Sequence, residues 1–158
     1  MTHHSFSEYN PPEGVEVETE PKSHGRVLRN LQHITRKRDM DQREFEALAS
    51  IQEKYLLKIG EDTRFTAELL RQMHKDWLGE IYEWAGQYRT VEMSKGGFTW
   101  PPALRVAPNM EVLEAGLLRA YTPCQPASLA TVARRMAEIH AELLLIHPFR
   151  DGNGRLAR

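Results

Sequence analysis

The sequence predicts a mainly α-helical protein with one small β-hairpin, on three observations. From Asp41 onward, apolar residues recur at steps of three and four positions, which is the spacing of a buried helix face. One stretch, residues 88–102, lacks this period and holds a Gly-Gly pair between β-prone residues. The chain has 158 residues, of which 41% are hydrophobic, so a single domain can bury a core of ordinary size.

The first forty residues differ from the rest, and we expect an N-terminal arm (residues 1–40) before one domain (residues 41–158). Val15–Glu20 alternates apolar and acidic residues and is followed by turn-forming residues, which favours a short strand. Basic residues are scattered between Lys22 and Arg38. Such a run can meet an anionic partner, but it is more often a solvated surface, and we favour the surface.

Two helices are expected between Asp41 and Gly79, separated by the stop signal Gly60. The predicted apolar stripe of the first is Phe45, Leu48, Gln52, Tyr55, Leu56 and Ile59. The stripe of the second, which starts near Thr63, is Phe65, Leu69, Met73 and Trp77. We expect His74 of the second helix to lie on the surface.

A hairpin is expected within residues 88–102, where two β-prone stretches flank Gly96 and Gly97. An isolated hairpin has an unpaired edge, and such an edge can add an extended strand from another chain. Alternatively the hairpin only closes the core, with Phe98 and Trp100 buried. Both interpretations can hold together.

Two further helices are expected before the end of the chain. Asn109 can cap the first, with Val112, Leu113, Leu117 and Ala120 on its apolar side. The stripe of the second is Leu129, Val132, Met136, Ile139, Leu143 and Ile146. Pro148 cannot continue this helix, and it should push His147 into an extended conformation.

Composition excludes several classes of protein. The formal net charge is −1, so the overall balance does not predict a nucleic-acid partner. No apolar run reaches the length of a membrane span, and the N-terminus has no secretory signal pattern. The one cysteine, Cys124, cannot form an intrachain disulfide. We therefore expect a cytoplasmic protein with no membrane partner, and composition leaves open its oligomeric state and its delivery into another cell.

The last twelve residues, HPFRDGNGRLAR, gather the residues of a phosphate site. A glycine-rich turn that enters a helix favours anions, because its free N–H groups and the helix dipole both attract negative charge. Arg155 and Arg158 lie on one helical turn and can reach one polyphosphate. Asp151 is a hard oxygen ligand suited to Mg²⁺, and His147 can accept a proton near neutral pH.

These residues resemble the Fic motif, H-x-F-x-[DE]-G-N-G-R-x-x-R, at every defined position. Residues 81–98, IYEWAGQYRTVEMSKGGF, are similar to the segment leading into the Fic flap, and GRVLRNL resembles the N-terminal region of small bacterial Fic proteins. The resemblance implies a helical Fic fold. It also implies transfer of AMP from the co-substrate ATP to a Ser, Thr or Tyr hydroxyl of a target protein.

By this resemblance, His147 is the general base and Asp151 binds Mg²⁺ at the α- and β-phosphates. The resemblance implies an anion hole of Gly152, Asn153 and Gly154, with Arg155 and Arg158 on the outer phosphates. It assigns target binding to a flap of Met93, Ser94, Lys95, Gly96, Gly97 and Phe98.

Two alternatives to AMP transfer remain. In the related Doc kinases a lysine takes the place of Gly154 and the γ-phosphate is transferred, so glycine here favours nucleotidyl transfer over phosphotransfer. The other alternative is a silent module that binds nucleotide or protein without turnover, against which the complete motif argues.

Two features depart from the family pattern. The inhibitory helix [ST]-x-x-x-E-[GN] is not found, because the sole Glu-Gly or Glu-Asn step, Glu13-Gly14, has Tyr9 four residues before the glutamate. Either a separate antitoxin supplies it, as for a toxin, or it lies in a C-terminal part of a longer product. The chain also ends inside the helix that should hold the phosphates, so we expect it to be a fragment of a longer product.

Overall fold

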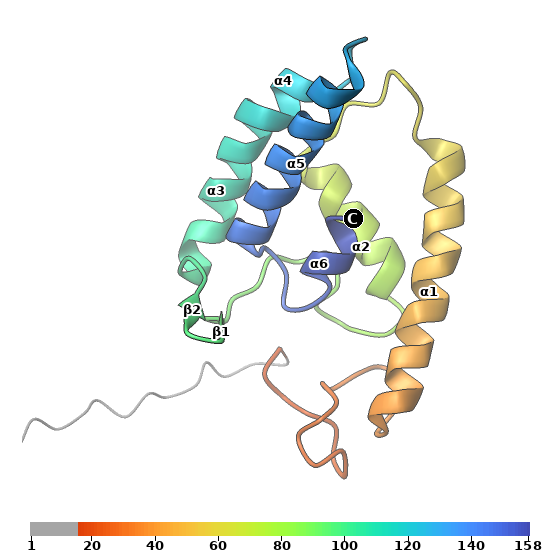
Figure 1. The fold of residues 1–158 in the computed structure, drawn as a ribbon. Helices are drawn as coiled ribbons and strands as arrows, with labels where there is room; N and C mark the ends of the chain where they lie inside the picture. The colour runs from red at the N-terminus through yellow and green to blue at the C-terminus, as the bar shows by residue number, and fades with distance from the viewer. Residues whose placement is uncertain (1–15) are drawn as a thin grey trace, which may run out of the picture.

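The computed structural model describes residues 16–158, and most of this part of the chain is helical (Figure 1). The only sheet in it is an antiparallel pair of two-residue strands. The helices are α1 (Lys37–Lys58), α2 (Ala67–Leu78), α3 (Val106–Leu113), α4 (Arg119–Tyr121), α5 (Leu129–Ile146) and α6 (Asn153–Leu156). The mainly α fold class predicted from the sequence is confirmed. No helix among residues 16–158 is both long and apolar enough to cross a bilayer.

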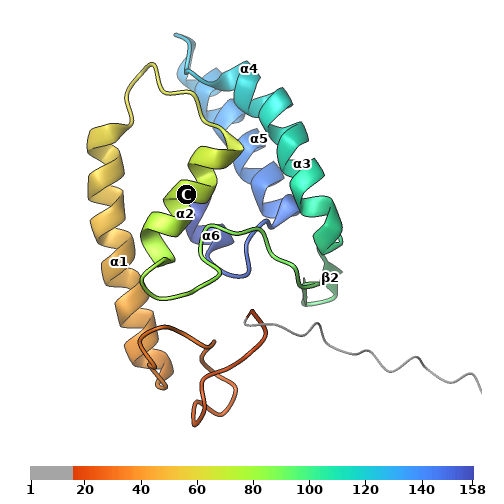
Figure 2. The ribbon, with the colours of Figure 1, turned by 180° about the vertical axis from the view of Figure 1, so that it is seen from behind.

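The helices form two groups, α1 with α2 and α3 with α5. Helix α1 packs on α2, whereas α3 packs on α5 at the opposite side of the molecule (Figures 1 and 2). Short helix α6 lies between these groups and contacts both α2 and α5. The residues that follow α5 are therefore placed at the centre of the fold.

Helix α1 buries a different face from the one predicted. Met40, Glu44 and Tyr55 are buried, whereas Phe45 and Leu56 are 64% and 81% exposed. The predicted apolar stripe therefore lies on the wrong side of the helix. The prediction failed because the face that is buried includes a glutamate, Glu44, which an apolar pattern does not count. Only Leu48 and Tyr55 of that stripe belong to the packed side.

Helix α2 starts later than predicted, at Ala67, because the side chain of Thr66 caps it by accepting a hydrogen bond from the N–H of Leu69. Trp77 is buried as expected. The prediction that His74 lies on the surface is wrong, since this side chain is fully buried.

The third predicted helix begins before Asn109, which lies inside α3 and does not cap it. A single π-helical turn, Glu114–Leu118, joins α3 to α4. In α5, Leu143 and Ile146 are buried as predicted, but Leu129 and Met136 are 85% and 66% exposed. The predicted stripe of α5 therefore packs only along its C-terminal half.

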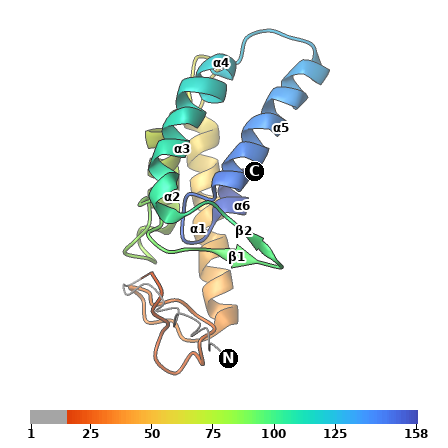
Figure 3. The ribbon, with the colours of Figure 1, turned by 90° about the vertical axis from the view of Figure 1, so that its left-hand side faces the viewer.

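The hairpin predicted around Gly96 and Gly97 is confirmed. Strand β1 (Ser94–Lys95) pairs with β2 (Phe98–Thr99), and it projects beside the C-terminal end of α5 (Figure 3). Both glycines have positive φ, as the tight turn requires. Phe98 is 48% exposed, so the alternative in which it closes the core is wrong for this residue.

The predicted N-terminal strand is reduced to an isolated bridge between Thr19 and Leu28. Its first residue, Val15, and the rest of residues 1–15 lie outside the described part of the chain. Helix α1 begins at Lys37, and the boundary placed at residue 40 stays a prediction.

Candidate active site

The C-terminal end of α5 presents His147. Its backbone is left-handed, with φ 53° and ψ 61°, and its N–H donates to the carbonyl of Leu143. The prediction of an extended His147 is therefore wrong. A left-handed residue commonly ends a helix, and histidine tolerates this conformation better than most residues.

Residues 147–152, which we call the α5–α6 turn, are held in shape by Asn153. Its side-chain oxygen accepts from the N–H of Phe149 (2.9 Å), and its side-chain nitrogen donates to the carbonyl of Phe149 (2.7 Å). Asn153 is buried and acts on the turn through this pair of bonds. Its side chain is therefore not free to meet an anion, and only its backbone N–H could do so.

Gly152 lets the turn approach α2 closely. It has φ 83°, and a Cβ at this position would lie 2.7 Å from Cζ3 of Trp77. Only glycine fits both the left-handed backbone and the contact with the indole. Gly154, in contrast, faces open space, since a Cβ there would meet nothing within 4 Å.

His74 links the α5–α6 turn to the segment after α2. Its Nδ1 accepts from the N–H of Gly86 (2.9 Å), so its Nε2 carries the proton and donates to the carbonyl of Asp151 (3.0 Å). Its ring stacks on Phe149 with centroids 4.0 Å apart. Burial lowers the pKa of His74 to about 4, so the ring is neutral.

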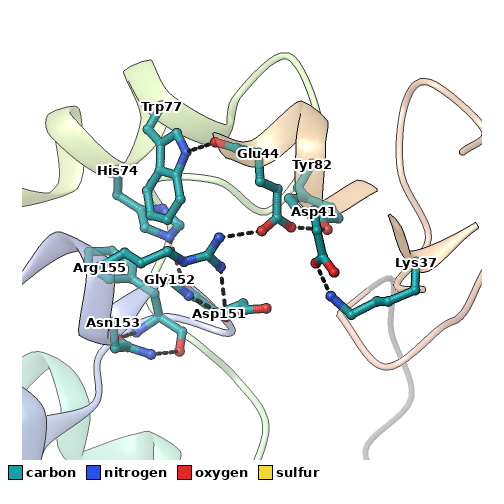
Figure 4. A network of polar contacts seen from close by, with 11 residues as sticks. Lys37, Asp41, Glu44, His74, Trp77, Tyr82, Asp151, Gly152, Asn153 and Arg155 are labelled. Atoms are coloured by element: carbon teal, nitrogen blue, oxygen red, sulfur yellow. Dashed lines mark hydrogen bonds and ion pairs between the residues drawn. The ribbon is translucent and has the colours of Figure 1, made fainter. Parts of the chain in front are cut away.

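Arg155 is paired with a buried carboxylate that the sequence did not indicate. One guanidinium nitrogen lies 2.5 Å from Oε2 of Glu44, and the guanidinium stands 4.7 Å from the ring centre of Trp77 (Figure 4). The hydroxyl of Tyr82 donates to the other Glu44 oxygen at 2.7 Å. Glu44 of α1 and Trp77 of α2 thus orient Arg155. Binding of a phosphate by Arg155 stays a prediction.

Asp151 is exposed and, within the described part of the chain, keeps one carboxylate oxygen free, and its role as a metal ligand stays a prediction. Its Oδ1 accepts from the N–H of Gly152 (2.5 Å) and lies 3.4 Å from a guanidinium nitrogen of Arg155. Its side chain is 49% exposed, and no hydrogen bond to Oδ2 is found among residues 16–158. Mg²⁺ usually keeps several waters and takes one or two carboxylates with phosphate oxygens, so a single free carboxylate oxygen fits it.

The first N–H groups of α6 can bind an anion. Among residues 16–158, the backbone N–H groups of Asn153 and Gly154 have no hydrogen-bond acceptor. Arg158 is exposed and donates to the carbonyl of Gly154 at 3.2 Å. A groove with a water-accessible volume of about 580 Å³ is lined by Arg155, Arg158 and apolar side chains of α1 and α2.

The His147 ring can act as a base towards the flap (residues Met93–Phe98). It is half-buried and stacks on Trp100 with centroids 4.0 Å apart. Its Nδ1 lies 3.4 Å from the carbonyl of Leu144, which favours a proton on Nδ1 and a free lone pair on Nε2. Burial lowers the pKa of His147 below its ordinary 6.5, so the ring is neutral at pH 7.

The base of the flap is thus fixed beside His147, while its strands are exposed. The N–H of Trp100 donates to the carbonyl of Met93 at 3.1 Å, and all four strand residues are exposed. Strand addition at this edge stays a prediction. The contact of Trp100, directly after β2, with the ring of His147 places the end of this strand beside His147.

Within the described residues, these features together define a helical domain with two free N–H groups at the start of α6 and a neutral histidine at the base of a β-hairpin. The chain belongs to the Fic/DOC family, whose model matches residues 64–158. That range contains the flap and the whole of the α5–α6 turn.

Curated relatives and solved structures agree with this membership. A probable protein adenylyltransferase of Sinorhizobium fredii is 33% identical over 132 residues, which cover 82% of this chain and 65% of the relative. The probable protein adenylyltransferase Fic of Escherichia coli is 26% identical over 137 residues, covering 84% and 64%. The chain therefore spans less than two thirds of the length of these relatives.

Among solved structures, the N-terminal Fic domain of a Bartonella effector protein from Bartonella sp. AR 15-3 superposes with a TM-score of 0.75 at 19% identity, covering 98% of this chain and 72% of that one. The BepC protein of Bartonella tribocorum, solved with bound AMPPNP, superposes with a TM-score of 0.71 at 20% identity, covering 82% and 68%. These likenesses establish the fold.

Three residues that contact the site were missed from the sequence: Glu44, His74 and Arg89, whose Nε donates to the carbonyl of His147 at 2.7 Å. Glu44 follows Met40 at helical spacing on the packed face of α1, and a glutamate within an apolar stripe signals a buried carboxylate. His74 has the same signal, because it lies four residues from Leu70 and three from Trp77, which are both buried. Arg89 lies in the irregular segment between α2 and β1, where no periodicity marks it.

Proposed function

We propose that this protein is a protein adenylyltransferase, which transfers AMP from ATP to a Ser, Thr or Tyr hydroxyl of a target protein. The observation that carries the proposal is the neutral His147, with a free Nε2, stacked on Trp100 at the base of the flap in a chain that also holds the free N–H groups of Asn153 and Gly154. The names of the curated relatives support the same reaction.

In this reaction, Nε2 of His147 takes the proton of the target hydroxyl. The hydroxyl oxygen then forms a bond to the α-phosphorus of ATP, and the bond from that phosphorus to the bridging oxygen breaks, so pyrophosphate leaves. The N–H groups of Asn153 and Gly154 stabilise the charge on the phosphates. Mg²⁺, held by Asp151, would neutralise phosphate charge.

The flap would hold the target as an added strand, which fixes its backbone and leaves its side chain free to enter the site. The open space at Gly154 leaves room for the α- and β-phosphates, which supports nucleotidyl transfer over phosphotransfer. We also propose that a separate antitoxin controls the activity, as in a toxin–antitoxin pair, by placing a glutamate on the exposed Arg158. The single, exposed Cys124 suits the cytoplasm, of the producing cell or of a recipient cell.

The test uses ATP labelled at the α-phosphate or at the γ-phosphate, added with the chain to a cell lysate. AMP transfer predicts labelled protein from α-label only, and no labelled protein with the variant His147→Ala. Labelling from γ-label alone would overturn the proposal in favour of a kinase. Nucleotide binding without labelling would overturn it in favour of a silent module.

A further inference from the structure

Arg89 is a buried arginine whose guanidinium is held by carbonyl groups. Its side chain donates to the carbonyls of His147 (2.7 Å), Val91 (2.8 Å), Pro101 (2.7 Å) and Ile146 (3.5 Å). The residue is 2% exposed and forms no salt bridge with another of residues 16–158. Burial lowers the pKa of Arg89, as expected for a cation without a carboxylate partner.

The four carbonyls belong to two parts of the site. Val91 and Pro101 lie on either side of the flap in the sequence, so they mark the two ends at which the flap leaves the domain. Ile146 and His147 lie at the C-terminal end of α5, where free carbonyls and the helix dipole favour a positive charge. One side chain therefore joins both ends of the flap to the backbone of the proposed base.

A backbone hydrogen bond supports the same link. The N–H of Arg89 donates to the carbonyl of Pro148 at 2.8 Å, so residues on both sides of the left-handed His147 cap are tied to Arg89. The indole of Trp100 adds a second connection, since its Nε1–H donates to the carbonyl of Leu144 at 3.0 Å. The flap and the end of α5 therefore form one hydrogen-bonded unit around Arg89.

We propose that Arg89 is a positioning residue that sets the distance between the hydroxyl of a flap-bound target and Nε2 of His147. The inference rests on the proposed function, in which the flap carries the target. The partners of the Arg89 side chain include none of the groups proposed to hold the phosphates. Arg89 therefore acts on transfer through the flap and His147. Binding of Mg-ATP does not depend on it.

Lysine cannot replace Arg89 in this role. The four carbonyls lie on three separate segments, and the planar guanidinium reaches them with donors in a fixed fork. A lysine ammonium keeps the charge but concentrates its three donors at one point. The variant Arg89→Lys therefore tests geometry without removing the charge.

The matched control is Arg71→Lys. Arg71 also donates from Nε to a backbone carbonyl, that of Gly86 at 3.0 Å, but it contacts neither the flap nor α5. For both variants and the unchanged chain we would measure the dissociation constant of Mg-ATP. The target is the lysate protein that the unchanged chain labels most strongly from α-labelled ATP. We would measure the rate at which each chain labels this protein at several lysate concentrations, which gives the maximal transfer rate.

Arg89→Lys should lower the maximal transfer rate by about 100-fold, the loss expected from a misplacement of about 1 Å, and leave the dissociation constant of Mg-ATP unchanged. Arg71→Lys should change neither quantity. An unaltered transfer rate in Arg89→Lys would overturn the inference. Equal losses of transfer and of Mg-ATP binding would also overturn it, because they indicate general damage to the fold.

Hydrogen exchange of the unchanged chain gives a test that needs neither activity nor a folded variant. If Arg89 joins the flap to α5, the amides of Trp100, Arg89 and His147 should exchange at one common opening rate. This rate should differ from the rate of the amides of α2. Exchange of the Trp100 amide far ahead of the His147 amide would refute the link. A chain that transfers no label would refute the proposed function alone, and the exchange result would still decide the role of Arg89.

Discussion

The variant Gly152→Ala tests whether the contact between the α5–α6 turn and α2 is as close as the structure has it. A Cβ at this position would lie 2.7 Å from Cζ3 and 3.1 Å from Cη2 of Trp77. Trp77 cannot move away easily, because it is 2% exposed and its Nε1–H donates to the carbonyl of Glu44 at 3.0 Å. The turn itself would have to shift.

The expected loss of stability has two parts. A left-handed backbone costs an alanine about 1–2 kcal/mol, and overpacking a full site costs about 1–3 kcal/mol more. Gly97 is the matched control, because its φ of 82° is close to the 83° of Gly152 while a Cβ there meets nothing within 4 Å. Gly97→Ala should therefore lose only the first part.

Chemical denaturation of the two variants measures this difference directly. The free energy of unfolding should fall by about 2–5 kcal/mol in Gly152→Ala and by about 1–2 kcal/mol in Gly97→Ala. Gly152→Ala should also weaken Mg-ATP binding, since a shift of the turn displaces the N–H groups of Asn153 and Gly154 that directly follow it. Equal losses of stability in the two variants would refute the close packing of Gly152 on Trp77.

Three further predictions follow from buried and titratable groups. Glu44→Gln should lower the free energy of unfolding by about 1–3 kcal/mol, because Arg155 loses a charged partner. Glu44→Ala should lower it further, since Tyr82 then loses its hydrogen-bond acceptor as well. Chemical denaturation of both variants checks this order. His74 has a pKa of about 4 in the folded chain against an ordinary 6.5, so the free energy of unfolding should fall by about 3 kcal/mol as the pH falls from 6.5 to 4. A His74→Gln variant that kept the same pH dependence in denaturation experiments would contradict this assignment. The transfer rate should fall with decreasing pH as His147 becomes protonated, with a midpoint below 6.5; a pH–rate profile with its midpoint above 6.5 would contradict the lowered pKa.

The parts of the fold predicted well are those set by short-range chemistry. The hairpin follows from Gly96 and Gly97, whose positive φ few other residues adopt, and the end of α5 follows from Pro148. The site around the α5–α6 turn was recognised because the glycines and polar side chains of residues 147–158 lie close together in the sequence. Local conformational limits act whatever the rest of the chain does.

What could not be predicted depends on contacts between distant segments. The buried face of α1 turns on Glu44, which is buried because Arg155 and Tyr82, far along the chain, satisfy its carboxylate. His74 is buried because Gly86 and Asp151 supply its two hydrogen-bond partners. Apolar periodicity counts such polar residues as exposed, so it misplaces the helix faces they occupy.

The central claim is that His147 acts as the base in AMP transfer and takes no part in holding the nucleotide. The most direct measurement compares the unchanged chain with His147→Ala, following single-turnover transfer from α-labelled ATP at saturating Mg-ATP and the dissociation constant of Mg-ATP in parallel. The account predicts a loss of transfer of about 10²–10⁴-fold with an unchanged dissociation constant. Transfer at an undiminished rate by His147→Ala would contradict it.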